Sequence, residues 1–344
     1  MHESGMAYCL ALVRTDISNP DVPAGYGPSD LQSAYNLPSS TDGAHQTVAI
    51  VDAYDDPNAE SDLGVYRTTF GLSACTTANG CFKKVNQKGQ QGNYPTGNAG
   101  WATEISLDVD MVSAGCPKCN ILLVEADSNS FGDLGASDNE AVALGARVVS
   151  NSYAGSGAPA KIEADYTHPG VVVLASSGDG GYGIGEPAGY PEVVSAGGTT
   201  LNRGGKGRGW TETAWSGTGA GCTTFKKPVW QAQIGCKFRV TNDVSAVANP
   251  ATGVAVYDTY DAPGFQVYGG TSVSSPLLGS VYGLAANEYK ADWAESVWLH
   301  KNHKYLYDIT SGSDGTCNPS ILCTAGVGWD GPTGWGSPNG IGAF

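Results

Sequence analysis

Short apolar runs recur along the chain, and they limit its possible folds more than any other feature. The run from Thr47 to Tyr54 is continuously apolar except for one acid near its end, which is typical of a buried parallel strand. Similar runs, with helical patterns between several of them, stand at 120–125, 146–152, 171–176, 193–196 and 254–257. This alternation predicts an α/β fold with a mostly parallel central sheet, helices on both faces, and ligands beyond the carboxyl ends of the strands.

The chain has 344 residues without an internal repeat or a low-complexity linker, so we expect one large domain. We interpret residues 1–24 as a leader segment of uncertain order and residues 25–344 as the folded domain, with a short helix expected at 28–36. The apolar run 7–13 is short and no Lys or Arg precedes it, so we do not interpret it as a signal peptide.

The net charge of −15 argues against nucleic acids and anionic membranes as partners, because both require basic patches. No run approaches the roughly 18 apolar residues of a membrane span, so we expect a soluble protein, which we take to be a monomer. The net charge also suits an acidic medium, in which protonation of carboxylates would bring it nearer to zero.

The nine cysteines fall mostly into neighbouring pairs, which predicts four local disulfides in an exported protein: Cys75 with Cys81, Cys116 with Cys119, Cys222 with Cys236, and Cys317 with Cys323. Cys9 is left over. Metal or redox chemistry at Cys116-Pro-Lys-Cys119 is the alternative, but no second pair has zinc-finger spacing.

Ser272 stands where a strand-like run meets a helix, in the stretch Gly269 to Gly279. A serine at a helix start lies near unpaired backbone N–H groups and the positive end of the helix dipole, which suits a nucleophile whose reaction develops an oxyanion. Pro276 fits the first helical turn, where no N–H is needed. A serine helix cap is the simpler interpretation of this motif alone.

Glu104 and Asp108 are four residues apart in a predicted helix at 102–114 and therefore share one face. A solvated acidic face is one explanation, but the many apolar neighbours favour a buried helix with coupled acids. Asp179 lies among glycines just after the predicted strand 171–176, and alone it would be an ordinary Asp-Gly turn.

Together these segments resemble the sedolisin family, the serine-carboxyl peptidases that share the subtilisin fold. Gly270-Thr-Ser-Val-Ser-Ser-Pro276 is similar to the family's nucleophile motif, which implies that Ser272 is the nucleophile. Glu104-Ile-Ser-Leu-Asp108 is similar to the family's acid pair, with Glu104 as the base and Asp108 as its support. Ser177-Gly-Asp-Gly-Gly181 is similar to the segment whose aspartate, here Asp179, helps to form the oxyanion hole.

The resemblance runs from about residue 28 to the C-terminus and makes residues 25–344 a serine-carboxyl peptidase domain. Further similar segments are Trp210-x-Glu212-x-x-Trp215, Pro228-x-Trp230-Gln231 and Asp243-Val-Ser-Ala246. Ser152-Tyr153-Ala154 departs from the family's Ser-Trp-Gly, and we expect an extended peptide substrate to pair with these residues as an added strand. Asn249 also departs, replacing a commoner aspartate.

Carboxyl groups at these positions predict activity in acid. At pH 4 an unperturbed histidine is only about 0.3% neutral, whereas an unperturbed glutamate is roughly one third ionised. A carboxyl such as Asp179 donates a hydrogen bond to an oxyanion only while it is protonated. A histidine triad using His45 and Asp52 is the alternative, but no histidine has the sequence context of subtilisins.

The resemblance also implies one structural Ca²⁺ ion near the C-terminus. Its ligands would be the carboxylates of Asp308 and Asp330 and the backbone carbonyls of Ile309, Gly326 and Gly328. Hard oxygen ligands without His or Cys suit calcium.

The expected function is therefore that of a secreted, acid-active serine-carboxyl endopeptidase acting on polypeptides. One alternative is an inactive relative that binds peptides. Another is an exported glycosidase that uses Glu104 and Asp108 as its carboxylate pair, which would leave the Ser272 motif unexplained.

Overall fold

The computed structural model describes residues 3–16, 19–231, 235–286, 293–299 and 304–344. A large sheet at the centre is built from β3 (Thr47–Ala53), β4 (Phe82–Asn86), β5 (Asn120–Ala126), β6 (Val148–Asn151), β8 (Val172–Ser176), β9 (Val194–Arg203), β10 (Trp210–Ala214) and β13 (Val244–Val247). Its eight strands run in the order β10-β9-β8-β6-β3-β5-β4, with β13 also pairing with β9. Only the β9–β10 pair is antiparallel, so the predicted mostly parallel sheet is confirmed.

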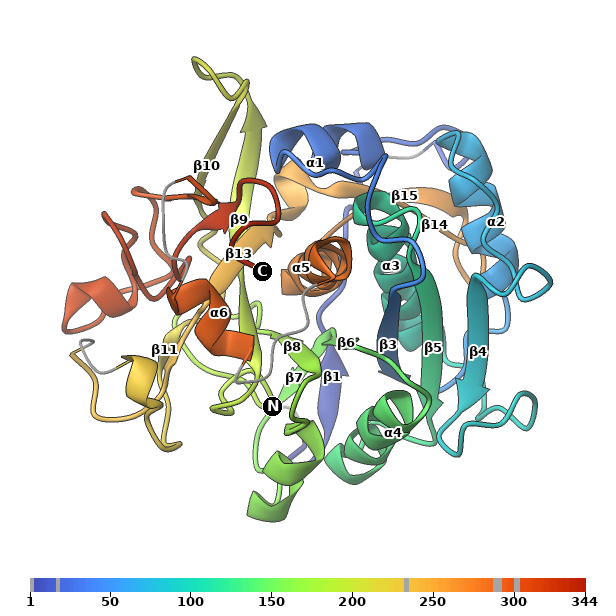
Figure 1. The fold of residues 1–344 in the computed structure, drawn as a ribbon, viewed down its shortest axis with the longest axis horizontal. Coiled ribbons are helices and arrows are strands. Elements are labelled where there is room, and N and C mark those ends of the chain that lie inside the picture. The colour runs from blue at the N-terminus through green and yellow to red at the C-terminus, as the bar shows by residue number, and fades with distance from the viewer. Residues whose placement is uncertain (1–2, 17–18, 232–234, 287–292, 300–303) are drawn as a thin grey trace.

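Helices cover both faces of this sheet (Figure 1). They are α1 (Pro28–Ala34), α2 (Ala59–Thr69), α3 (Ala99–Gly115), α4 (Phe131–Ala143), α5 (Thr271–Ala285) and α6 (Trp293–Leu299). Successive residues of a strand point to opposite faces, and β3 follows this rule. Val48 and Ile50 belong to the core that contains α3 and α5, whereas Ala49 and Val51 belong to the core that contains α4.

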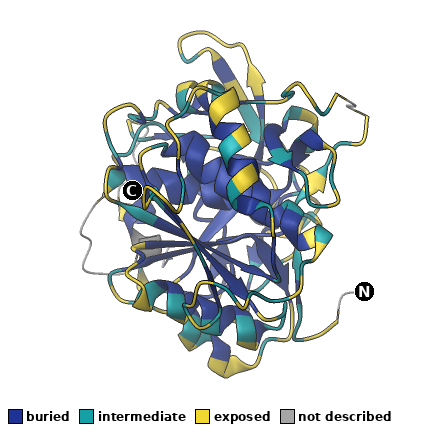
Figure 2. Cartoon of the chain, turned by 90° about the vertical axis from the view of Figure 1, so that its right-hand side faces the viewer, coloured by how far each residue is buried: buried dark blue, intermediate teal, exposed yellow. Residues whose placement is uncertain are grey.

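The two helices that carry the site motifs are almost wholly inside the molecule. Every residue from Thr271 to Leu284 in α5 is buried, and so is every residue of α3 from Glu104 to Gly115. Figure 2 shows the central strands and these helices buried, with exposed residues gathered on the outer helices and loops. A helix whose apolar residues leave little room for a solvated side belongs in the core of a large domain, as the sequence of α3 predicts.

The apolar run at 254–257 forms β14 (Val254–Asp258), but its expected place in the parallel sheet is wrong. It pairs antiparallel with β15 (Gly264–Gly269), which in turn pairs with β2 (Leu12–Val13) in a separate three-stranded sheet. An apolar run predicts a buried strand without specifying its sheet, which accounts for the error.

The remaining strands are short. They are β1 (Ala7–Cys9), β7 (Tyr153–Gly155), β11 (Gly221–Cys222), β12 (Val240–Thr241), β16 (Leu306–Tyr307) and β17 (Ser337–Pro338). The four predicted disulfides are present and Cys9 is free. Across the described ranges, no helix combines the length and apolar character that crossing a membrane requires.

Candidate active site

Ser272 is the second residue of α5, and a single residue, Gly270, separates this helix from β15. The turn between strand and helix requires glycine at Gly270, which has a φ of +99°. A methyl group there would come within 1.9 Å of the Leu10 carbonyl oxygen and 2.6 Å of Asp179 Oδ2. Ser272 is fully buried, and its hydroxyl donates to the Ser152 carbonyl at 3.2 Å.

The expected position of Pro276 in the first turn is wrong, because α5 begins at Thr271 and encloses this proline. A proline inside a helix leaves the carbonyl four residues earlier without its usual partner. Here that carbonyl belongs to Ser272, and it accepts a hydrogen bond from Ser152 Oγ at 3.4 Å. Ser152 therefore contacts Ser272 twice and links β6 and β7 to the start of α5.

Glu104 and Asp108 lie on one face of α3, and neither is exposed. Burial raises the pKa of Glu104 to about 8, although the nearby Ser272 hydroxyl and the hydrogen bonds from the Leu10 and Ala11 amides oppose the rise. Burial, Asp52 and Glu104 together raise the pKa of Asp108 well above its usual range. The structure therefore brings Ser272 and both acids together and makes the acids strongly coupled.

Asp179 lies near the start of the same helix, in the loop that follows β8. Its Oδ1 accepts hydrogen bonds of 2.8 Å from both the backbone N–H and the hydroxyl of Thr271. Oδ2 has no hydrogen-bond partner among the described residues. Burial raises the pKa of Asp179 to about 7, against the lowering effect of the Thr271 bonds. Below that pH the carboxyl is neutral and can donate a hydrogen bond from Oδ2 toward Gly270.

Residues 7–11 of the chain itself run through this site. Figure 1 shows β1 beside β7. Strand β1 pairs antiparallel with β7, with Tyr8 opposite Ala154 and Cys9 opposite Tyr153. Beyond β1, the N–H groups of Leu10 and Ala11 donate to Glu104 Oε2 at 2.7 and 2.8 Å. The backbone edge that we predict for substrate is thus paired with a segment that we expected to be a leader.

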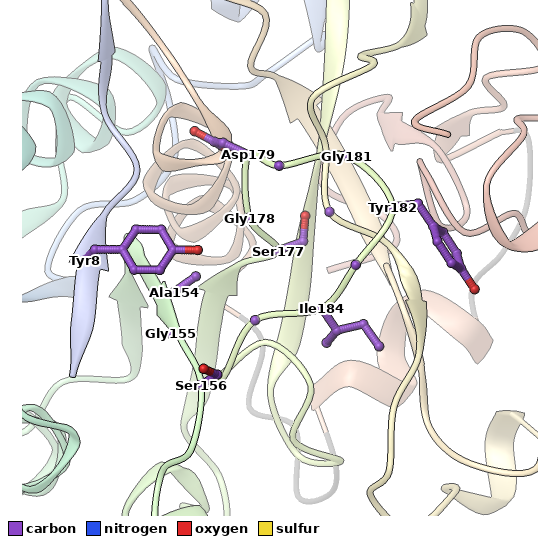
Figure 3. A pocket seen from close by; sticks show the side chains of 14 residues that line it. Tyr8, Ala154, Gly155, Ser156, Ser177, Gly178, Asp179, Gly181, Tyr182 and Ile184 are labelled. Atoms are coloured by element: carbon purple, nitrogen blue, oxygen red, sulfur yellow. The ribbon is translucent and has the colours of Figure 1, made fainter. Parts of the chain in front are cut away.

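A pocket of about 380 Å³ adjoins the site (Figure 3). Tyr8 and Ala154 form one side of it, and the loop from Ser177 to Gly185 curves around the other, with Asp179 at its rim. Tyr153 does not line this pocket. Its ring is buried on the α4 side of the sheet, where its hydroxyl donates to Asn151 at 2.7 Å.

Comparison with known proteins shows the family to which this chain belongs. The sequence profile of the subtilase family matches residues 78–328. Kumamolisin from Bacillus sp. (strain MN-32) is 31% identical over 366 residues, which cover 94% of this chain, and sedolisin from Pseudomonas sp. (strain 101) is 27% identical over 360 residues, which cover 91%. The chain belongs to the subtilase family, in its sedolisin branch. It spans 64% and 60% of the lengths of these two relatives.

Solved structures place this sedolisin-branch chain in the same fold. Pseudomonas sedolisin, a serine-carboxyl proteinase complexed with two molecules of pseudo-iodotyrostatin, superposes with a TM-score of 0.78 at 25% identity and covers 92% of this chain and 96% of that one. Sphericase superposes with a TM-score of 0.59 at 17% identity, covering 93% and 99%, a likeness of fold alone. The predicted subtilisin-like fold is therefore confirmed.

Asp52 is a carboxyl of this sedolisin-branch site that motif matching does not include. It lies near the end of β3, is fully buried, and has no hydrogen-bond partner in the described part of the chain. Burial, Glu104 and Glu125 raise its pKa well above the usual range. His45 is exposed at the opposite end of β3, so it does not form a triad with Asp52. The sequence signal that could have identified Asp52 is its position as an acid near the end of an apolar strand.

In this sedolisin-branch chain, the predicted calcium ligands lie in or beside the loop at 326–330. Asp308 accepts from the N–H of Gly328 at 3.0 Å, and Asp330 accepts from the N–H of Gly326 at 2.9 Å. Burial is the main cause that raises the pKa of Asp330 to about 7, and repulsion by Asp308 adds to it. Asp314, which is buried with both carboxyl oxygens unpartnered in the described regions, adds further negative charge nearby.

A calcium ion between Asp308 and Asp330 would remove this repulsion, so the residues present fit such an ion. Among the described residues, no set of three or more His, Cys, Asp and Glu side chains is placed to hold a metal. The predicted site has only two such side chains and relies otherwise on carbonyls, including that of Ile309.

Proposed function

We propose that this chain is an acid-active serine-carboxyl endopeptidase. The observation that supports this most strongly is the arrangement around its own residues 10 and 11. The Leu10 carbonyl oxygen lies against Gly270, which Asp179 Oδ2 also approaches, while the Ala11 N–H bonds to Glu104. Nucleophile, base and oxyanion donor thus surround one stretch of extended backbone, as hydrolysis of a peptide bond requires.

In the proposed mechanism, Ser272 Oγ forms a bond to the substrate carbonyl carbon while Glu104, supported by Asp108, takes the hydroxyl proton. The neutral carboxyl of Asp179 and the backbone N–H of Ser272, which lies in the first turn of α5, stabilise the oxyanion. The C–N bond then breaks, and Glu104 returns the proton to the leaving amine. Water repeats the sequence at the acyl-enzyme and releases the second product.

The raised pKa of Asp179 suits an enzyme that works in acid, whereas the raised pKa of Glu104 does not. Asp179 is a donor only below about pH 7, where it is neutral. Glu104 is a base only when ionised, yet its raised pKa of about 8 keeps it neutral in acid while residues 7–11 cover it. We therefore infer that the form with residues 7–11 in the site is a resting form, because its base is neutral at the acidic pH at which we propose the enzyme acts.

A polypeptide substrate would follow the path of residues 7–11. It would pair with β7 through backbone atoms of Ser152, Tyr153 and Ala154 and place side chains toward the pocket beside Asp179. The bond equivalent to that between Leu10 and Ala11 would lie between Ser272 and Glu104.

We also propose that the protein binds one calcium ion and is exported from the cell. Asp308, Asp330 and the carbonyls of Ile309, Gly326 and Gly328 would hold one Ca²⁺ ion, which would supply structural charge compensation to the loop. Four disulfides fit a secreted protein, which we expect to act as a monomer.

Cleavage of an unfolded polypeptide between pH 3 and pH 8 tests this proposal. Wild type should cleave best in acid, and both Ser272→Ala and Glu104→Gln should reduce cleavage by at least about a thousandfold. Ser280→Ala is the matched control, because within the described ranges the hydroxyl of this buried serine donates to Leu277 of its own helix and to no other segment. Undiminished cleavage by Ser272→Ala refutes the mechanism, and peptide binding without any cleavage favours an inactive relative.

A further inference from the structure

Glu125 is a buried acid that the proposed mechanism does not use. It is the Cα partner of Asp52 on β3 and of Asn86 on β4, so these side chains share one face of the sheet. That face packs against α3, which carries Glu104 and Asp108. Glu125 and Glu104 both raise the pKa of Asp52 by repulsion, and Asp52 does the same to Asp108. We call these four residues the carboxyl line: Glu125, Asp52, Asp108 and Glu104.

Six oxygens of the carboxyl line have no hydrogen-bond partner in the described part of the chain. All four residues are fully buried. Neighbouring buried carboxyls do not all ionise together, because each charge disfavours the next. The pH at which the first charge forms on the line therefore depends on the fixed charges at its ends.

Lys84 provides positive charge at the outer end of the line. Its Nζ lies 3.3 Å from Glu125 Oε1, forms an ion pair with Asp55, and donates to the Asp56 carbonyl at 2.8 Å. Burial lowers the pKa of Lys84, but Glu125 and Asp55 outweigh burial and raise it. Within the described ranges, no other Lys or Arg forms an ion pair with a member of the line.

The outer end also reaches solvent. Lys84 and Asp55 have side chains 14% and 12% exposed, and both line a pocket of about 330 Å³ on the surface together with Glu60 and Tyr94. The inner end faces the substrate path instead. The Ser272 hydroxyl lies beside Glu104. Other titratable groups that face the line are Asp56 beside Glu125, Asp179 beside Glu104, and Cys9, Tyr153 and Tyr268.

We propose that Lys84 and Asp55 are positioning residues that set the pH at which the catalytic carboxyls ionise, through the electric field of their charges along the carboxyl line. The positive charge of Lys84 favours a carboxylate on the line, and the negative charge of Asp55 opposes it. Neither residue touches substrate. This inference rests on the proposed function, because it concerns the base that the peptidase uses.

Three variants test it through the acid limb of kcat/KM, the limb on which the base ionises. Lys84→Met should move that limb to higher pH by about half a unit to one unit, because a nearby favourable charge is lost. Asp55→Asn should move it to lower pH by a similar amount. The double variant should return close to wild type, since both charges are then absent.

Two controls separate charge from packing. Lys84→Arg keeps the charge and should leave the limb in place. Lys83→Met removes an equal charge from the exposed neighbour on β4 and should also leave it in place. A structural role alone would lower activity or stability without opposite shifts from Lys84→Met and Asp55→Asn, and that result overturns the inference.

A second readout does not need turnover. In a Ser272→Ala background, the carboxyl carbon resonance of Glu104, assigned with Glu104→Gln, should titrate at higher pH in Lys84→Met and at lower pH in Asp55→Asn. If Lys84→Met fails to fold, the kinetic test and the resonance test are both made with Asp55→Asn. A wild-type chain without peptidase activity refutes the proposed function, whereas an active wild type with an unmoved limb and an unmoved resonance refutes only this inference.

Discussion

The backbone N–H of Ala11 donates a hydrogen bond of 2.8 Å to Oε2 of Glu104. In acyl transfer, the group that takes the serine proton returns it to the leaving amine, so the base must reach the nitrogen of the bond to be cut. The relation between Ala11 and Glu104 has this geometry. It also places the chain's own backbone where a substrate would bind.

Removing that backbone should strengthen substrate binding. Deletion of residues 1–11 leaves β2 intact and should lower KM for a short peptide by about tenfold or more, because the site is no longer occupied by residues 7–11. Deletion of residues 1–5 ends before β1 and should leave KM unchanged. Equal KM values for both deletions would show that the segment does not compete with substrate.

Replacing Asp179 should alter the alkaline limb of activity. Its folded pKa of about 7 means that the neutral donor is present below pH 7 and lost above it. Asp179→Asn donates at every pH, so activity should extend above pH 7, whereas Asp179→Ala should lose about 10²–10³-fold in kcat. Pre-steady-state or steady-state rates from pH 3 to 9 measure both effects, and an unchanged alkaline limb in Asp179→Asn would contradict the assigned role.

The buried acids also predict a protein that is more stable in acid. A carboxyl whose folded pKa is raised stabilises the fold below its unfolded pKa, near 4, and this contribution is lost as pH rises through the folded pKa. Burial raises the pKa of Asp258 to about 6 and that of Asp56 to about 7, so stability should fall between pH 4 and pH 7.

Urea unfolding of the Ser272→Ala protein measures this fall without self-digestion. Asp258→Asn should reduce the difference in unfolding free energy between pH 4 and pH 8 by about 1–3 kcal/mol. Asp127→Asn, which removes an exposed carboxyl, should not. Stability that rises from pH 4 to pH 8 would contradict the account.

Calcium removal should destabilise the C-terminal loop. A chelator at neutral pH should lower Tm by several degrees, because an ion bound only to the folded state stabilises it. Asp330→Asn should lower Tm and abolish the response to chelator. An identical Tm with chelator and with added calcium would contradict the assignment of a calcium site to this loop.

The helices that carry Ser272 and Glu104 could be predicted from the sequence, because both lie in long apolar segments with a strong local pattern. The position of Pro276 inside α5 could not be predicted, because Ser152, which donates to the carbonyl that this proline leaves without its helical partner, belongs to a distant segment. Such contacts between distant segments leave no local signal.

The same limit applies to the N-terminal residues. The run at 7–13 is apolar, but its pairing with β7 depends on which sheet edge the rest of the fold leaves open. The sequence indicates only part of the role of Asp52. Its position at the end of β3 could be predicted, but its electrostatic interaction with Glu104 and Asp108 depends on the fold.

Trapping the acyl-enzyme tests the central claim most directly. Wild type is mixed with an activated peptide ester at pH 4, quenched with strong acid, digested and analysed by mass spectrometry. The account predicts the acyl group on Ser272, absent from Ser272→Ala and strongly reduced in Glu104→Gln. Turnover of the ester without any acyl group on Ser272, or undiminished turnover by Ser272→Ala, would contradict it.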